Sequence, residues 1–188
     1  MRFKNIAVLS GVLCLAASGA HAEGYAGALL ELSSYNSDGL CARYTTQSTA
    51  STCDNRTAGL KVFAGVGGGS ASGVEAAYID FGRTRSTVDG QSLDVRVSSF
   101  VVAGVLRASP LPSLSVNAKL GVAASKATAK NLGNSVSRAH PSLYLGLGVD
   151  CEIVKNVKAV GSIDFVRAKL DGERFGVVGF GLGAQVGF

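Results

Sequence analysis

Segments in which apolar residues alternate with small or polar ones recur eight times along this chain. An alternation with a period of two gives a β-strand two chemically different faces. Segments of about ten residues can cross a bilayer as tilted strands, and an even number of them can close into a ring that pairs every backbone N–H and C=O group. The pattern therefore predicts an all-β fold, an eight-stranded antiparallel up-and-down transmembrane β-barrel.

The connections between these segments are alternately long and short. The expected strands lie near residues 25–33, 58–66, 73–81, 93–106, 114–124, 141–150, 157–166 and 175–188. Long loops are expected at 34–56, 82–92, 125–139 and 167–174, with short turns between the other strands. The alternation puts Leu120 and Val122 on an outer face and Lys119 on the inner one, and it assigns Val97 and Val101 to the outer face of the fourth strand.

Charged residues in the middle of the expected strands all have the parity opposite to the apolar set. They are Glu31, Lys61, Glu75, Arg96, Lys119 and Asp164. Charges that face lipid are costly, so we expect these side chains to point into the lumen while the apolar set faces acyl chains. A soluble, lipocalin-like barrel would reverse the two faces and is the alternative.

The six charges are expected to form a belt across a narrow interior. We expect Glu31 to lie opposite Lys61, and Lys61 to lie near Glu75. The interior of an eight-stranded barrel is just wide enough for side chains to fill, and unpaired buried charges are heavily penalised. A hydrogen-bonded plug that fixes the strand register is therefore predicted, and a rearrangeable gate for small ions is the alternative.

The first 22 residues have the features of a secretory signal peptide. Arg2 and Lys4 precede an apolar stretch over residues 6–17, and Ala20-His21-Ala22 is a small-residue cleavage site. The apolar stretch is too short to span a membrane as a stable helix. We therefore expect a signal peptide at 1–22, cleavage after Ala22, and one exported barrel domain at 23–188.

Cysteine positions point to an oxidising compartment. Cys41 and Cys53 lie in the same expected loop of an exported chain, so a Cys41–Cys53 disulfide is predicted. Such a bridge would stabilise the loop by about 3 kcal/mol. Metal binding is the lesser alternative, because two cysteines without nearby histidines make a poor site. Cys151 is left as a free or lipid-interface thiol, and the sequence indicates no cofactor and no metal.

Several segments carry a resemblance to a known family. They are residues 59–65, 74–82, 118–122, 146–150 and 154–157, with the terminal Phe188. In this order they resemble the OmpA-like transmembrane domain of small Gram-negative outer-membrane barrels. The resemblance implies an integral protein of the cell outer membrane and, during biogenesis, contact with the outer-membrane assembly machinery. The terminal strand would be the assembly signal, with Phe180, Leu182, Val186 and Phe188 on one face.

Basic residues in two expected loops suggest a partner at the membrane surface. The third long loop carries Lys126, Lys130 and Arg138, and the fourth carries Arg167, Lys169 and Arg174. Such bases would stand where lipopolysaccharide phosphates lie, so contact with outer-membrane lipids and lipopolysaccharide is expected. Adhesion through the loops is a further role, for which the sequence names no partner. No nucleic-acid motif is present.

An enzymatic alternative rests on one short motif. Lipid A deacylases, which are also small outer-membrane barrels, use a His-x-Ser pair with an acid, and His140-Pro141-Ser142 resembles it, with Asp164 as the candidate acid. Parity turns His140 and Ser142 toward the lumen, whereas an acyl chain arrives from the lipid side. The sequence therefore favours a non-enzymatic barrel with a structural or surface-interaction role. A narrow ion-conducting channel is the first alternative, and a lipid A deacylase-like enzyme is the second.

Overall fold

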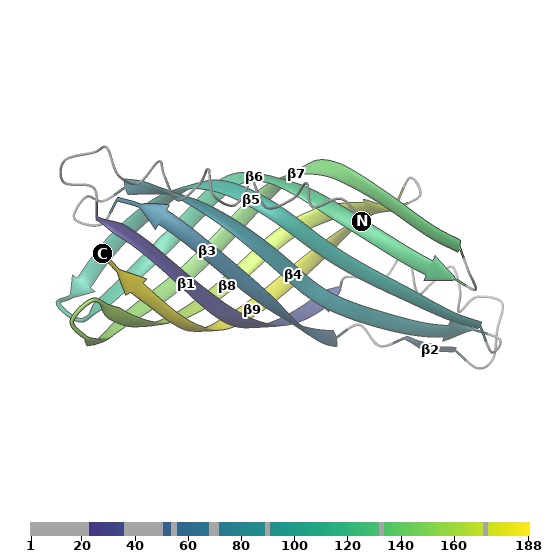
Figure 1. Cartoon of the computed structure of the whole chain (residues 1–188), viewed down its shortest axis with the longest axis horizontal. Coiled ribbons are helices and arrows are strands. Elements are labelled where there is room, and N and C mark those ends of the chain that lie inside the picture. The colour runs from purple at the N-terminus through teal and green to yellow at the C-terminus, as the bar shows by residue number, and fades with distance from the viewer. Residues whose placement is uncertain are drawn as a thin grey trace, which may run out of the picture.

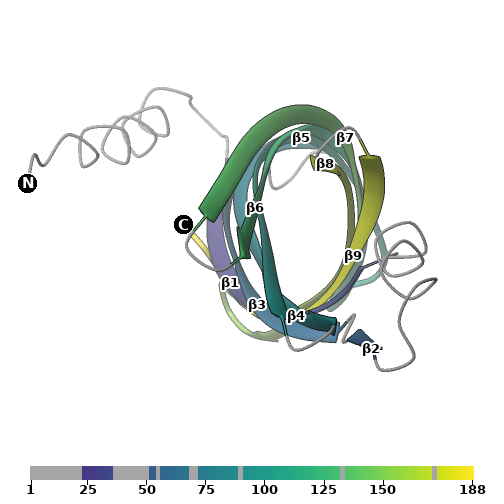
Figure 2. The ribbon, with the colours of Figure 1, turned by 90° about the vertical axis from the view of Figure 1, so that its right-hand side faces the viewer.

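The chain forms a closed antiparallel barrel. The computed structural model describes residues 23–35, 51–53, 56–67, 72–88, 91–131, 134–170 and 173–188. Its strands are β1 (Gly24–Tyr35), β2 (Ser51–Cys53), β3 (Arg56–Val66), β4 (Ser72–Val88), β5 (Gln91–Leu111), β6 (Leu114–Asn131), β7 (Asn134–Val154), β8 (Val157–Leu170) and β9 (Glu173–Gly187). The ring runs β4-β3-β1-β9-β8-β7-β6-β5, and a β4–β5 ladder closes it (Figures 1 and 2). The predicted eight-stranded fold is confirmed, and the short β2 adds to the end of β4.

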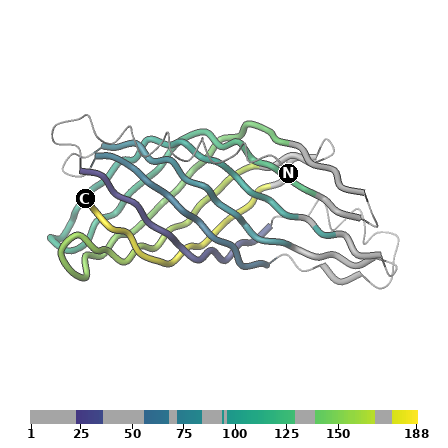
Figure 3. The backbone as a smooth tube through the Cα atoms, in the orientation of Figure 1, coloured from purple at the N-terminus to yellow at the C-terminus, as the bar shows by residue number. Residues whose placement is uncertain are grey.

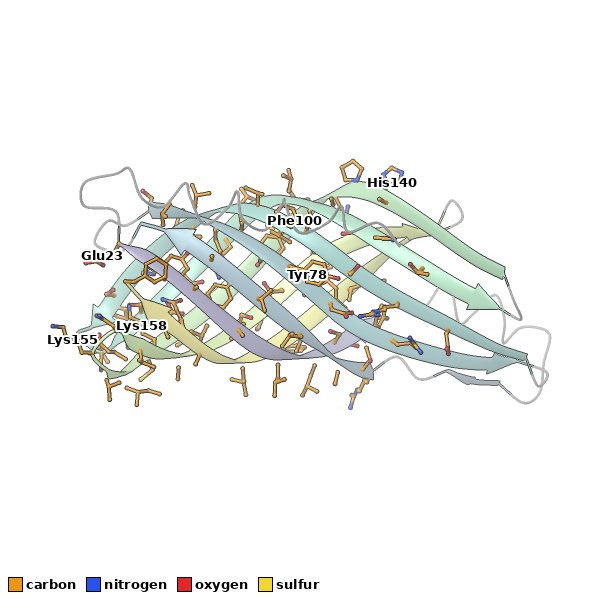
Figure 4. All side chains as sticks on the ribbon, in the orientation of Figure 1. Glu23, Tyr78, Phe100, His140, Lys155 and Lys158 are labelled. Carbon is orange, nitrogen blue, oxygen red and sulfur yellow. The ribbon has the colours of Figure 1, made fainter. Side chains whose placement is uncertain are left out.

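The two faces of the barrel wall have the predicted sidedness. Leucine, valine and phenylalanine side chains of the apolar parity are exposed on the outside, among them Leu30, Leu120, Leu147 and Leu182. Lysine, glutamate and aspartate side chains of the other parity are buried inside. In Figure 4 many side chains project away from the outside of the wall. This distribution is the reverse of a lipocalin interior.

No helix within the described parts of the chain is both long and apolar enough to span a membrane.

The inward and outward faces of β5 are opposite to the prediction. Val97 and Val101 are buried inside, whereas Arg96 and Phe100 are exposed outside. Both parities of this strand carry apolar residues, so alternation alone leaves its orientation ambiguous. The register decides it, because Phe100 pairs with Tyr78 of β4, which also faces outward. Arg96 is therefore not part of a lumen belt.

Strands β4 to β7 occupy most of two expected loops, and β8 and β9 also continue into the expected loop 167–174. The segments 82–92 and 125–139, predicted to be loops, are mostly strand, and β5 and β7 reach 21 residues each. Outside a bilayer both strand faces can meet water, so alternation fades, but the valine, serine and threonine there still pair as strands. Figure 1 shows the ribbons of these strands running on past the rest of the barrel, and Figure 3 traces the tilted strands of the barrel wall through their Cα atoms.

The projecting sheet has an open margin along β7. The ladder between β7 and β8 begins at Tyr144, opposite Val166, whereas β7 pairs with β6 back to Asn134. Beyond Val166, β8 pairs with β9. Within the described residues, β7 before Tyr144 is therefore hydrogen-bonded on one side alone.

Two of the three described residues with positive φ lie where the wall bends or turns, and the third is Gly67 after β3. Gly82, at φ 82°, lies in a β-bulge where the β4–β5 register shifts between Asp80 and Arg83. A Cβ at Gly82 would collide with the backbone of Ala58. Asn156, at φ 66°, makes the tight turn between β7 and β8, a conformation that asparagine tolerates better than most residues.

Candidate functional site

The first part of the interior network centres on Asp164 of β8. Lys61 Nζ donates to its two oxygens at 2.6 and 2.8 Å, and Ser162 Oγ donates at 2.8 Å. The Tyr144 hydroxyl is a further donor to Asp164 Oδ1. Both side chains of the Lys61–Asp164 pair are 0% exposed. Asp164 therefore accepts hydrogen bonds from three side chains on three strands.

A second pair crosses the lumen between β4 and β6. Lys119 Nζ lies 2.7 Å from both oxygens of Glu75, and the Tyr25 hydroxyl donates to Glu75 Oε2 at 3.2 Å. The ring centroid of Phe63 lies near both lysines, 5.2 Å from Lys119 Nζ and 5.9 Å from Lys61 Nζ. Such contacts are favourable cation–π interactions. The two pairs and the ring fill the middle of the barrel.

A third pair closes the network toward the turn between β7 and β8. Arg107 Nε lies 3.7 Å from Asp150 Oδ2, and Asn117 Nδ2 donates to both oxygens of Asp150 at 3.2 Å. The Arg107 guanidinium stacks 5.2 Å from the Tyr25 ring. A cavity of about 380 Å³ opens beside it, lined by Arg107, Lys158 and eight other residues.

The partners of the lumen charges differ from the predicted ones. Lys61 bonds Asp164 rather than Glu31, and Glu75 bonds Lys119 rather than Lys61. The prediction paired strands that are neighbours in sequence, but inward side chains of a narrow barrel converge from opposite walls. Lys61 and Asp164 are 103 positions apart. The long side chain of a lysine can therefore cross the lumen to a carboxylate on the opposite wall. A prediction that pairs only strands adjacent in sequence misses such a partner.

Glu31 is buried in the same region and stands apart from these pairs. It is 1% exposed, and neither of its carboxylate oxygens has a hydrogen-bond partner among the described residues. The carboxylate lies over Gly179 and Gly181 of β9, where the absence of side chains makes room for it. The charged groups that act on it are Asp164, Lys61 and Lys119.

Sequence reasoning missed several members of the network. Tyr144 and Asn117 have the inward parity of strands that were correctly assigned, but only charged residues were considered there. Arg107 was placed in a turn, although β5 continues through it to Leu111. Asp150 was taken as a strand end. The parity of these residues was available in the sequence, whereas their partners were not.

Arg96 lies on the outside, beyond the apolar part of the wall. Its Nε donates to Asp80 Oδ1 at 3.2 Å, its Nη2 contacts Asp80 Oδ2, and the side chains are 52% and 18% exposed. The outward Tyr78 and Phe100 mark the end of the apolar band, and the pair lies past them toward the strand extensions. Partial burial alone would raise the pKa of the Asp80 carboxyl, but the Arg96 hydrogen bonds and charge bring that pKa below its ordinary value.

The predicted surface bases lie on strands instead of loops. Lys126 is exposed on β6 and Arg167 is exposed on β8. The backbone of Lys130 continues β6, Arg138 lies in β7, Lys169 in β8 and Arg174 in β9, and their side chains are outside the described part. The loop assignment was wrong for the same reason as the strand ends.

The described residues cover only some of the cysteines for which predictions were made. Cys41 and the side chain of Cys53 lie outside the described residues, so the predicted disulfide stays a prediction. Cys151 is free and exposed at the β7 end. Among the described residues, no group of three or more His, Cys, Asp or Glu side chains is arranged to hold a metal ion.

The candidate deacylase residues have other contacts. His140 is exposed on the β7 extension (Figure 4), whereas parity had predicted a lumen position. In the described residues β7 has no ladder with β8 before Tyr144, so the extension is open on that side and parity no longer implies burial. Ser142 Oγ lies 3.3 Å from Ser125 Oγ, and Asp164 is held by Lys61, Tyr144 and Ser162.

The terminal strand presents the expected outer face. Phe180, Leu182, Val186 and Phe188 are all exposed. Phe188 also pairs with Gly24 through two backbone hydrogen bonds of 2.9 Å, beside the β1–β9 ladder. This pairing brings the described start of β1 next to the last residue.

Comparison with known proteins gives the same architecture. The crystal structure of Ail, the attachment invasion locus protein of Yersinia pestis, matches with a TM-score of 0.56 and 21% identity, over 87% of this chain and 98% of that one. Neisserial surface protein A gives 0.62 and 11%, over 88% and 97%. OprG from Pseudomonas aeruginosa gives 0.59 and 10%, over 89% and 96%. No curated protein sequence matches. The family model described as outer membrane protein beta-barrel domain matches residues 6–188.

Proposed function

The chain belongs to the family of outer membrane protein β-barrel domains, and on that premise we propose that it is a non-enzymatic integral outer-membrane protein with a structural or surface-interaction role. In this proposal the barrel anchors the protein, and the extensions of β4 to β7 present the interacting surface. Contact with lipopolysaccharide is the expected first interaction, and adhesion through the loops is a further one.

The main observation that supports this proposal is the contrast between a filled barrel interior and a projecting sheet. Tyr144, Lys61, Phe81 and Leu29 are all fully buried inside the barrel. Side chains of this size leave little room for a solute. The longest strands, in contrast, continue past the ladder that joins β7 to β8. A protein with a filled barrel and an extended outer sheet is suited to contacts at its surface.

Positive charge supports lipopolysaccharide as the partner. Lys126 and Arg167 are exposed on outward strand positions. Lys126 lies at the strand extension, because its neighbour Ser125 pairs with His140 there. Phosphates of an outer leaflet would bind such bases through charge-assisted hydrogen bonds. Attraction of this kind weakens as salt is raised.

The test compares bases at the two ends of the barrel. The double variant Lys126→Glu with Arg167→Glu should bind lipopolysaccharide-containing bilayers several-fold more weakly than the parent protein. Lys155→Glu, on the exposed turn between β7 and β8, is the matched control and should bind as the parent does. Equal binding by all three proteins would contradict the lipopolysaccharide role.

A soluble polyanion can separate surface charge from bilayer insertion. Ail of Yersinia pestis has been crystallised with the heparin analogue sucrose octasulfate, which makes that compound a convenient probe. Binding of the probe to the refolded chain should be salt-sensitive and weaker in the double variant. Binding that survives high salt unchanged would argue against an electrostatic contact.

Ion conduction is the alternative from another class. The refolded chain in a planar bilayer should be silent, because the interior is occupied by buried aromatic and paired charged side chains. Reproducible single-channel steps would instead favour the narrow channel. A deacylase role predicts loss of lipid A deacylation in Ser142→Ala, and a parent protein without that activity removes this alternative.

The proposal also includes export through a cleaved signal peptide and oxidation of two cysteines. We expect cleavage after Ala22, which N-terminal sequencing of the membrane-inserted protein would establish. A Cys41–Cys53 disulfide should appear as a mass difference of two hydrogens on reduction, with Cys151 alkylated in either state. Contact with the assembly machinery through the last strand should be weakened by Phe188→Ala, which crosslinking during biogenesis would measure.

A further inference from the structure

The cavity beside Arg107 lies at the mouth of the barrel where β1 begins and β9 ends, and it holds about 380 Å³. Charged side chains of both signs line it: the bases Arg107 and Lys158, and the acids Glu23 and Glu152. Pockets for small molecules have volumes of about 300–1,000 Å³, so there is room here for a compact ligand. The charge pairs described above fill the interior beyond the cavity, which makes it a cup instead of a passage.

Arg107 reaches this cavity from β5 with part of its hydrogen-bonding capacity unused. Its side chain is 9% exposed. Nη1 donates to the carbonyl oxygen of Gly67 at 3.3 Å, whereas Asp150 Oδ2 lies 3.7 Å from Nε, beyond hydrogen-bond range. The buried Nε has no hydrogen-bond partner among the described residues. An unpaired buried donor is costly, so an acceptor supplied by a ligand would be favourable here.

Lys158 and Gln185 add donors from the two strands on the other side of the cavity. They are partners in the β8–β9 ladder, and both line the space. Gln185 is 4% exposed and Lys158 is half-buried. Within the described residues, no carboxylate lies within ion-pair distance of the Lys158 amine. A carboxylate that enters the cavity would therefore meet a guanidinium, an ammonium and an amide as donors.

The two acids give the same cavity a negative part. Glu23 stands before β1, where its carbonyl accepts from Gly67 N at 3.1 Å, and Glu152 is opposite Lys158 in the β7–β8 ladder. Neither carboxylate makes an ion pair with a side chain in the described part of the chain. The acids would repel a ligand that carries negative charge alone, and the bases would repel one that carries positive charge alone. A ligand with one charge of each sign avoids both penalties.

We propose that this cavity binds a small zwitterion, an amino acid or a short peptide, with its carboxylate toward Arg107 and Lys158 and its ammonium toward Glu23 and Glu152. The planar guanidinium fork suits a carboxylate better than a lysine alone would. The site lies at the opposite end of the barrel from the proposed lipopolysaccharide contact, and it does not depend on that contact.

The experiment titrates the protein, purified from membranes into detergent micelles, with the dipeptide alanyl-alanine. Backbone amide signals of Gly24 and Gly187, which line the cavity, should shift and saturate in NMR spectra. N-acetyl-alanyl-alanine lacks the ammonium and alanyl-alanine amide lacks the carboxylate. Each should bind about tenfold more weakly than the dipeptide, because one charge-assisted contact is lost. Tighter binding of free alanine than of the dipeptide would identify an amino acid as the ligand.

Two variants assign the two ends of the ligand. Lys158→Gln should bind alanyl-alanine about tenfold more weakly and leave the affinity for alanyl-alanine amide unchanged, because the amide has no carboxylate to lose. Glu152→Gln should weaken the dipeptide equally and leave the affinity for the acetylated dipeptide unchanged. Lys155→Gln is the matched control, since this exposed base on the adjoining turn does not line the cavity, and it should bind all three compounds as the parent does.

The comparison of the three dipeptides on the parent protein decides the proposal even if a variant folds poorly. No saturable shift with alanyl-alanine or alanine at millimolar concentrations would overturn the site. Equal affinities for the three dipeptides would also overturn it, because the charges of the ligand would then play no part. A Lys158→Gln protein that folds and binds the dipeptide as the parent does would count against the assigned carboxylate position.

Discussion

The Lys61–Asp164 and Arg96–Asp80 pairs each join a base on one strand to a carboxylate on another, but their surroundings are opposite. The first is 0% exposed on both sides and is braced by Tyr144 and Ser162. The second is 52% and 18% exposed on the outer wall. Removing one partner of a buried pair leaves a charge without water, whereas an exposed charge is simply hydrated. The same chemistry should therefore matter much more inside the barrel than outside it.

The largest effect is expected for Lys61→Met. It leaves Asp164 without its base and removes one of the two positive charges that act on Glu31, so the free energy of unfolding should fall by about 3–5 kcal/mol. Urea titration in lipid bilayers would measure it, followed by gel mobility or circular dichroism because the chain has no tryptophan. Adding Asp164→Leu should recover part of the loss. A loss below about 1 kcal/mol would contradict the comparison.

A smaller effect is expected for Gly146→Ala. Its Cβ would stand 2.6 Å from the Tyr144 hydroxyl and 3.2 Å from Lys119 Cβ, so the phenol would have to leave Asp164. Overpacking of this kind costs about 1–3 kcal/mol. The matched control is Gly161→Ala on β8, where the nearest atom is Leu182 Cδ2 at 3.6 Å. If both variants unfold at the same urea concentration, the interior is looser than this geometry indicates.

Arg96→Met should change the free energy of unfolding by less than about 1 kcal/mol. The guanidinium is half exposed, and salt screens what attraction remains. The same urea titration measures this loss of stability, and comparison with Lys61→Met shows how much less the outer pair contributes than the inner pair. A loss of stability comparable to that of Lys61→Met would show that the outer pair is less hydrated than its exposed fraction implies.

The smallest effect concerns pH at the outer pair. The pKa of Asp80 is held below its ordinary value of about 3.9, so the pair is complete above that pH and is lost as the pH falls through the lower folded-state value. Carboxyl chemical shifts followed by NMR would measure this titration. Arg96→Met should return the Asp80 midpoint toward the ordinary value, and an unchanged midpoint would mean that another group controls it.

The barrel could be predicted from sequence because one wall face must meet lipid and the other must not. That requirement fixed Leu120 outside and Lys119 inside. It failed for β5, where Val101 and Val102 are both apolar and only the pairing with β4 settles which faces inward. It also failed at the strand ends, because outside the bilayer the two faces no longer need to differ.

The charge partners could not be predicted, since parity says which side chains enter the lumen but not which wall they reach. Lys61 and Asp164 meet across the barrel from β3 and β8. The role of Gly179 and Gly181 is equally hidden in sequence, because glycine in a strand has several possible reasons. Only their register with Glu31 shows that they leave space for its carboxylate.

The open margin of β7 contains Pro141, which is exposed and pairs with Ala124 on its other side. Proline brings no N–H group, and natural sheets use it on unpaired margins to interrupt hydrogen bonding with foreign strands. A strand from an adjacent barrel could not lay down an unbroken ladder there. Pro141 therefore protects this edge against extension of the sheet by a second chain.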